Sequence, residues 1–259
     1  MTHLSPESIA ARLTTRCFGR ALEYLPQTGS TNDVARERAR AGAPEGLLVV
    51  TDEQVSGRGR RGRTWAAPPG SAILASVVLR PRTPLAEAFA PTMIFALAVR
   101  AAARAWGAPT GLKWPNDVLC RGRKLAGILC EMTLTGGSTE FVVAGFGVNV
   151  DLEPDALGLG AVATSLRQEI SGPLPTREEV LADILAEAEA RYTRWQAGGY
   201  AAIWAEWRDA LTTLGSYVRI DPGDGALIEG TALHVAPDGA LLVRTAAGEQ
   251  AVIAGTVLF

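Results

Sequence analysis

A loop rich in arginine and glycine, SGRGRRGRTWAAPPG at residues 56–70, is the first stretch whose composition indicates chemistry. Guanidinium groups bind phosphate oxygens in pairs, and glycines let a ligand approach the backbone closely. The loop is costly to order, because neighbouring arginines repel one another and glycine loses the most backbone entropy. A polyanionic ligand would offset both costs. From composition alone, a phosphate-binding loop and a solvated charged turn remain equally open. The residues concerned are Gly57, Arg58, Gly59, Arg60, Arg61, Gly62 and Arg63.

Two familiar phosphate-binding motifs are excluded for this loop. Residues 57–62 spell G-x-G-x-x-G and residues 57–64 resemble a P-loop, but both motifs work by opening a helix. Pro68, Pro69 and Gly70 follow too closely for such a helix to continue. A disordered RNA-binding arm would be longer, interleaved with aromatic residues and usually terminal, whereas this loop lies between two predicted strands.

Three further stretches supply groups that a phosphate loop would need. They are KWPNDV at residues 113–118, KLAGILCE at 124–131 and GFGVNV at 145–150. Each has an ordinary interpretation when taken alone. Lys113 and Lys124 could be solvent-facing lysines at strand ends, Asp117 a turn former and Asn149 a strand-end cap.

Together with STND at residues 30–33 and EQVSGRGRRGRTW at 53–65, these stretches resemble, in order, the motif set of biotin protein ligases. The resemblance covers Ser30 to Asn149 and a small C-terminal β-domain. Only 29 residues precede Ser30, too few for the winged helix-turn-helix of the ligases that are also repressors. We therefore expect the short, ligase-only type, without sequence-specific DNA binding.

The resemblance implies a two-step reaction. ATP, with Mg²⁺, activates biotin as biotinyl-5′-AMP, and the biotinyl group then passes to a lysine of the biotin carboxyl carrier protein of acetyl-CoA carboxylase. One alternative is a lipoate or octanoate ligase or transferase of the same fold, which would lack the GRGRRGR and WPND stretches. The other is a nucleic-acid-binding module that uses the arginine loop.

The resemblance also assigns roles to residues. Asp117 is the candidate to orient or deprotonate the acceptor amine, with a structural turn as the competing interpretation, and the metal ligands stay unassigned. The implied catalytic residues are Arg58, Lys124 and Asp117. The implied biotin-binding residues are Ser30, Thr31, Asn32, Gln54, Gly57, Arg58, Gly59, Arg60, Lys124 and Gly127. The implied ATP-binding residues are Arg58, Arg60, Arg63, Trp65, Lys113, Asn116, Lys124 and Asn149.

Composition sets the class of protein that must position these residues. The 259 residues are 47% hydrophobic and 20% charged with a net charge of −2, so no overall field attracts nucleic acid. Three cysteines without a C-x-x-C pair argue against a disulfide framework or a zinc site and favour the cytoplasm. The N-terminus lacks the apolar core of a secretory signal, and the apolar run from Met93 stops at Arg100, short of a membrane span. A homodimer remains open.

Consecutive strands with turns between them at residues 111–150 predict an antiparallel or mixed sheet rather than repeated βαβ units. The resemblance implies an α+β fold, with a mixed sheet flanked by helices. The resemblance refines this to a class II synthetase-like sheet in a catalytic domain of residues 1–212, followed by an SH3-like barrel at 213–259. Helices are expected at residues 5–15, 32–41, 84–107, 176–198 and 200–211. Strands are expected at residues 21–28, 46–54, 71–79, 111–114, 117–120, 124–134 and 139–150, with further short strands after Thr213.

Overall fold

The computed structural model describes residues 3–223 and 225–258, and its largest element is a seven-stranded mixed sheet. Its strands are β1 (Leu22–Thr28), β2 (Leu48–Gln54), β3 (Ala72–Leu79), β4 (Thr110–Lys113), β5 (Asp117–Cys120), β6 (Arg123–Thr135) and β7 (Ser138–Asn149). The spatial order is β1-β2-β3-β7-β6-β5-β4. Only the β1–β2 pair is parallel, and the other neighbours are antiparallel. The prediction of a mixed sheet is confirmed.

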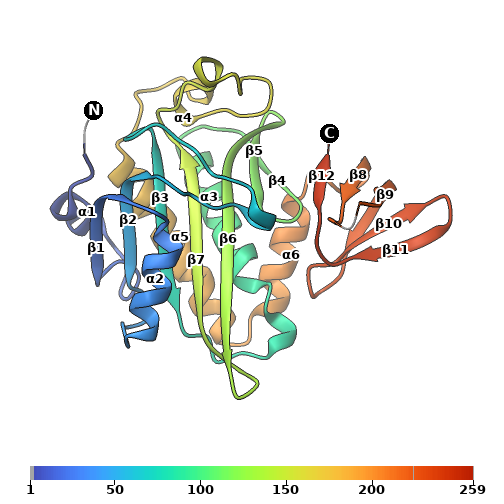
Figure 1. The fold of residues 1–259 in the computed structure, drawn as a ribbon, viewed down its shortest axis with the longest axis horizontal. Helices are drawn as coiled ribbons and strands as arrows, with labels where there is room; N and C mark the ends of the chain where they lie inside the picture. The colour runs from blue at the N-terminus through green and yellow to red at the C-terminus, as the bar shows by residue number, and fades with distance from the viewer. Residues whose placement is uncertain (1–2, 224, 259) are drawn as a thin grey trace.

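Helices cover both faces of this sheet. On one face, α2 (Thr31–Arg40) packs against β2, β3 and β7. On the other, α3 (Ala90–Ala105) lies against the sheet and packs on α5 (Arg177–Gln196) and α6 (Tyr200–Ala210) (Figure 1). Two short helices complete the set, α1 (Pro6–Arg12) beside α5, and α4 (Leu166–Glu169). Single 3₁₀ turns occupy Arg60–Gly62, Leu85–Glu87 and Pro154–Leu157.

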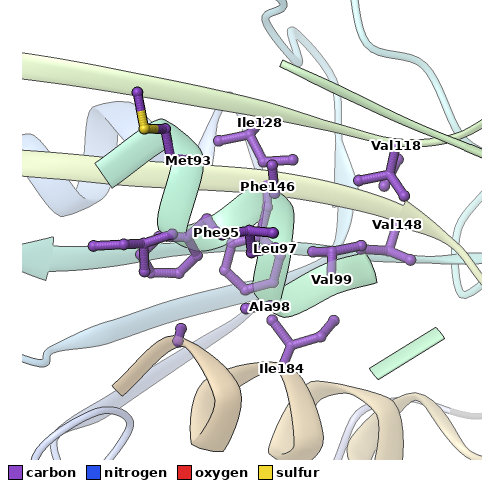
Figure 2. Close-up of a cluster of buried hydrophobic side chains, with 14 of the residues drawn as sticks. Met93, Phe95, Leu97, Ala98, Val99, Val118, Ile128, Phe146, Val148 and Ile184 are labelled. Carbon is purple, nitrogen blue, oxygen red and sulfur yellow. The ribbon is translucent and has the colours of Figure 1, made fainter. Parts of the chain in front are cut away.

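Alternate residues of strand β7 pack into two different hydrophobic cores, one on each face of the sheet. Phe146 and Val148 belong to the larger core, where Phe146 lies 5.5 Å from Phe95 of α3, between ring centroids. Figure 2 shows α3 between these strands and Ile184 of α5. The alternate residue Val143 packs in the smaller core beneath α2. Because side chains of a strand alternate between faces, Gly145, Gly147 and Asn149 also lie on the α2 side.

The predicted elements differ from the observed ones mainly at their ends. The helix predicted at 84–107 is shorter, because Pro91 opens α3 and a separate 3₁₀ turn occupies Leu85–Glu87. Residues Leu85–Ala105 are long and apolar enough to cross a membrane by length and composition, but 61% of their apolar window is buried inside the protein. This is the behaviour of a core helix. The turn at Pro154–Leu157 and helix α4 were not predicted.

A small antiparallel sheet follows α6. Its strands are β8 (Tyr217–Asp221), β9 (Ile228–Val235), β10 (Leu241–Thr245), β11 (Gly248–Val252) and β12 (Thr256–Leu258). Their order is β11-β10-β9-β8-β12, so within the described ranges β11 and β12 are both edges and closure into a barrel is not confirmed. The buried Trp114, in the turn after β4, donates from Nε1 to Gly239 O at 2.8 Å, which ties the two sheets together.

Candidate active site

A cavity of about 710 Å³ opens on the α2 side of the large sheet. Its floor is made by glycines of β6 and β7. A Cβ at Gly147 would lie 2.5 Å from Cε2 of Trp65, and one at Gly127 would lie 3.1 Å from Cζ3 of the same ring. A Cβ at Gly145 would overlap the Asn32 side chain. The missing side chains therefore create the space that the indole and any ligand occupy.

Hydroxyl and amide groups line the end of the cavity near α2. Gln54 Oε1, at the end of β2, accepts from Thr31 N at 2.8 Å and from Thr31 Oγ1 at 3.1 Å. Ser30 occupies the N-cap position of α2 without a side-chain capping bond, so its hydroxyl is not used to cap the helix. These groups offer donors and acceptors to a neutral polar ligand such as a cyclic urea.

Cationic groups line the other end. Lys124 Nζ lies 2.7 Å from Asp117 Oδ1 and 5.5 Å from the centroid of the Trp65 ring. Burial lowers the pKa of Lys113 to about 8, with Lys124 and Arg63 adding to the effect and Asp117 opposing it. Burial also lowers the pKa of the Arg60 guanidinium. Asp117 is the single carboxylate among the described residues that line the cavity, so this end carries excess positive charge and suits a polyanion.

The cationic end of the cavity contains every lysine of the chain. Lys113 and Lys124 are the only two lysines in the 259-residue chain. Both line the cavity. Every other cationic side chain at neutral pH is an arginine, and only these two carry a primary amine.

A segment after β7 forms one wall and was not predicted. Lys124 N donates to Val162 O at 2.9 Å, and Thr164 N donates to Lys124 O at 2.9 Å, so the segment runs beside the start of β6. Asn149 Nδ2 donates to Thr164 O at 2.9 Å. The Asn149 amide, predicted to touch nucleotide, thus fixes this wall. The wall residues are small or apolar and carry no local signal of a site: Leu159, Ala161, Val162 and Ala163.

Glu169 of α4 anchors the same wall from behind. Its side chain is fully buried and accepts from Thr164 Oγ1 at 2.7 Å and Arg123 Nη2 at 2.9 Å, and also from Arg121. Burial would raise the pKa of this carboxyl, but the hydrogen bonds from Thr164, Cys120 and Arg121 and the charge of Arg123 hold it below its ordinary value. The ionised carboxylate therefore stabilises the position of the wall.

The arginine loop makes more contacts within the protein than expected. Arg61 donates from Nη1 to Asp221 O at 2.6 Å, at the end of β8, and from Nη2 to Pro222 O, the residue that follows. Arg58 Nη2 lies 2.7 Å from Asp33 Oδ1 and 3.1 Å from Glu131 Oε2. Carboxylates and carbonyls of the protein therefore already offset part of the arginine repulsion, a role that the sequence pattern suggests for a polyanionic ligand.

The structure brings the predicted site residues together with one exception. All of them line the cavity except Gly57, which lines a second pocket formed by the loop with Asp33, Leu129 and Glu131. A Cβ at Gly57 would lie 2.9 Å from Gln54 Nε2 and would overlap the Trp65 carbonyl, so a glycine fits the crowded backbone there. Trp65 Nε1 is buried and, in the described part of the chain, has no hydrogen-bond partner. The C-terminal strand also reaches the cavity, through Gly255, Thr256, Val257 and Leu258.

No group of three or more potential metal-ligating side chains occurs in residues 3–223 and 225–258. Magnesium is usually held by one or two carboxylates together with substrate phosphates and waters. The cavity offers Asp117 for such a role and no further described carboxylate.

Comparison with protein families matches two parts of the chain. Residues 24–149 match the biotin/lipoate A/B protein ligase family, and residues 213–259 match the biotin protein ligase C terminal domain. The chain is 36% identical over 245 residues to the biotin–[acetyl-CoA-carboxylase] ligase of Mycobacterium tuberculosis, covering 92% of this chain and 89% of that protein. The Paracoccus denitrificans ligase of the same name is 36% identical over 244 residues, covering 91% and 99%. The bifunctional ligase/repressor BirA of Bacillus subtilis is 36% identical over 248 residues, covering 95% and 76%.

Solved structures show the same fold. The biotin protein ligase from Aquifex aeolicus in complex with biotin and ATP superposes with a TM-score of 0.77 at 24% identity, covering 92% of this chain and 98% of that chain. The Helicobacter pylori biotin acetyl coenzyme A carboxylase synthetase with bound biotinylated ATP gives 0.62 at 19% identity, covering 91% and 100%.

Proposed function

This chain belongs to the biotin protein ligases, and on that membership we propose that it activates biotin with ATP and transfers it to a protein lysine. In the first step a biotin carboxylate oxygen attacks the α-phosphorus of ATP, and pyrophosphate leaves as biotinyl-5′-AMP forms. In the second step the lysine amine attacks the biotinyl carbonyl, and AMP leaves. The observation that carries the proposal is one cavity with amide and hydroxyl groups at one end and excess positive charge at the other.

We propose that the α2 end receives the ureido ring of biotin. Thr31 and Gln54 are held in fixed relation by their hydrogen bonds, and Ser30 stands beside them without a capping bond. The ring presents N–H donors and a carbonyl acceptor, which hydroxyl and amide groups can match. The valeryl chain would then run over the glycines of β6 and β7 toward the cationic end.

At the cationic end, two anions must approach each other, so electrostatic stabilisation is the main catalytic contribution. Lys124 would bind where the carboxylate meets the α-phosphate. Lys113, Arg60 and Arg63 would bind the remaining phosphates, with Trp65 packing against the bound adenylate. These roles require ammonium and guanidinium groups held in place, not a covalent intermediate on the enzyme.

We propose that Mg²⁺ enters with the nucleotide. The residues fit this arrangement, because Asp117 is a single carboxylate already paired with Lys124 at 2.7 Å and the phosphates would supply most ligands. When bound, the ion would neutralise phosphate charge.

In the transfer step, Asp117 is our candidate to orient the acceptor amine or take its proton. The pairing with Lys124 keeps its carboxylate beside the site of the reacting anhydride. A purely structural role where the turn meets the first residue of β5 is the alternative. Asp117→Asn separates the two if adenylation persists while transfer falls.

The remaining features of the proposal concern organisation and partners. We propose a class II synthetase-like catalytic domain of residues 1–212 and an SH3-like barrel of residues 213–259, supported by the match of residues 213–259 to the C-terminal domain family. The acceptor we propose is the biotin carboxyl carrier protein of acetyl-CoA carboxylase, after the names of two relatives. We also propose a cytoplasmic protein that can form a homodimer and that binds neither membrane nor specific DNA.

Mass spectrometry of purified protein with biotin and Mg²⁺-ATP tests the function. Biotinyl-5′-AMP should form, and addition of a biotin carboxyl carrier domain should yield a biotinylated lysine. Lipoate and octanoate in place of biotin are the matched controls. Adenylation of lipoate or octanoate without adenylation of biotin would contradict the proposal, and salt-resistant, sequence-specific DNA binding would favour the nucleic-acid alternative.

A further inference from the structure

Deepening the proposed function, on which it rests, we propose that Glu131 is a positioning residue for biotin recognition. Glu131 lies on β6 and is absent from the residues that line the cavity. It connects Asn32, at the start of α2, with Arg58, at the start of the arginine loop. It therefore acts on the ligand only through its neighbours.

The first half of the connection is the Asn32 amide. Nδ2 donates to Glu131 Oε2 at 2.7 Å and to Leu129 O at 3.1 Å. Oδ1 lies 2.6 Å from the Ser76 hydroxyl, and the side chain is buried against Gly145. Both Asn32 donors are thus used within the protein, so this amide has no hydrogen left for biotin. Asn32 holds the start of α2 against β3 and β6.

The second half is the arginine loop. Arg58 donates to Glu131 from Nη2 at 3.1 Å and from Nη1 at 3.3 Å. Asp33 and Arg36 complete a ring of alternating charge, in which Arg36 Nη2 lies 2.8 Å from Glu131 Oε2 and Arg58 Nη2 lies 2.7 Å from Asp33 Oδ1. Two carboxylates and two guanidiniums make the ring neutral, which lets a guanidinium of a strongly basic loop rest against α2.

Both connected elements carry groups that face the cavity. Thr31, next to Asn32, holds Gln54. Arg58 pairs its backbone with Thr64 across the loop, so its position fixes Gly59, Arg60 and Arg63 on the cavity wall. Loss of the Glu131 carboxylate would leave the Asn32 amide with one acceptor fewer and would detach Arg58 from β6, so that only the pair of Arg58 with Asp33 would hold the loop to α2. Part of the free energy of biotin binding would then be used to order the loop.

The test compares Glu131→Gln and Glu131→Ala with the wild type. A charge-assisted hydrogen bond contributes about 1.5–3 kcal/mol, so we expect biotin to bind roughly ten- to a hundredfold more weakly by calorimetry. The adenylation rate at saturating biotin should stay within about threefold, because the carboxylate touches no reacting atom. Glu229→Gln, which breaks the 2.7 Å Arg219–Glu229 pair in the C-terminal sheet, is the matched control and should bind biotin normally.

Two further measurements separate positioning from general destabilisation. In an Arg58→Ala background, Glu131→Gln should add little further loss of biotin affinity. Trypsin should cleave the loop at residues 58–63 faster in Glu131→Gln than in the wild type without any substrate, while the midpoint of thermal unfolding stays unchanged. Fully additive losses, or unchanged affinity and cleavage, would overturn the role of Glu131. A wild type that neither binds biotin nor forms the adenylate would instead overturn the proposed function, and the substrate-free cleavage still tests the connection.

Discussion

The charge of Lys113 should disappear within the pH range in which most proteins stay folded. Its pKa is lowered to about 8, mainly by burial. A lysine loses its positive charge as the pH rises, so about ten in eleven molecules carry the ammonium at pH 7 and about one in eleven at pH 9. If this ammonium binds the phosphates of ATP, kcat/KM for ATP should fall about tenfold over that interval, since kcat/KM reports groups of the free enzyme.

Pyrophosphate release at saturating biotin and low ATP, measured from pH 6.5 to 9.5, checks this expectation. Lys113→Arg keeps its charge throughout and should flatten the profile, because the guanidinium does not titrate there. Lys113→Ala should be slow and equally flat. A second assay reads the amine directly: labelling by an amine-selective reagent across the same pH range, followed by mass spectrometry, has only two lysines to resolve. A tenfold fall that persists in Lys113→Ala, or a labelling midpoint above pH 10, would refute the reasoning.

Three other outcomes follow from the site. Lys124→Ala should slow adenylate formation by about 10²–10³, because it removes one charge where the two anions meet. The rate is measured as pyrophosphate release, and the midpoint of thermal unfolding should not change. Normal adenylation would show that Lys124 is only a solvent-facing lysine. Glu169→Gln should lower the midpoint of thermal unfolding at pH 7, and the difference from the wild-type midpoint should shrink in acid. Folding lowers the pKa of this carboxyl, so the carboxylate stabilises the fold above its ordinary pKa, and this stabilisation is lost as the pH falls through the pKa of the folded state. An equal difference in midpoint at every pH would contradict this. Gly147→Val should weaken biotin binding at least tenfold by calorimetry without loss of the fold, because its side chain would enter the space of Trp65; unchanged affinity would show that the floor has room to spare.

The sequence predicted the sheet and the main helices, and all the predicted site residues except Gly57 line the cavity. These predictions succeeded because motif residues at strand ends and regular alternation are local properties. Residues Asp117 and Gly127, for example, sit on adjacent strands in direct register. The direction of a side chain was less predictable. Arg58 lines the cavity, but no local pattern predicted that its guanidinium would also contact Glu131, 73 residues away in the chain.

The unpredicted parts share a physical reason. The wall at residues 159–163 is small and apolar, and its place beside Lys124 depends on the buried Glu169 and on Thr164. Backbone hydrogen bonds between distant segments leave no pattern in either segment. The approach of β12 to the cavity likewise depends on how the two sheets dock around Trp114.

The scarcity of lysine bears on the hazard of the product itself. A biotinyl-adenylate is an acylating agent that any accessible primary amine can consume. Outside Lys113 and Lys124 this chain offers no side-chain amine at all, although its sequence contains 25 basic residues of the lysine and arginine kind. Arginine supplies the charge without the nucleophile, since its guanidinium stays protonated. An anhydride that escapes the cavity therefore finds no lysine on the outer surface of the molecule that made it. Acylation is thus directed toward the amine that a partner brings.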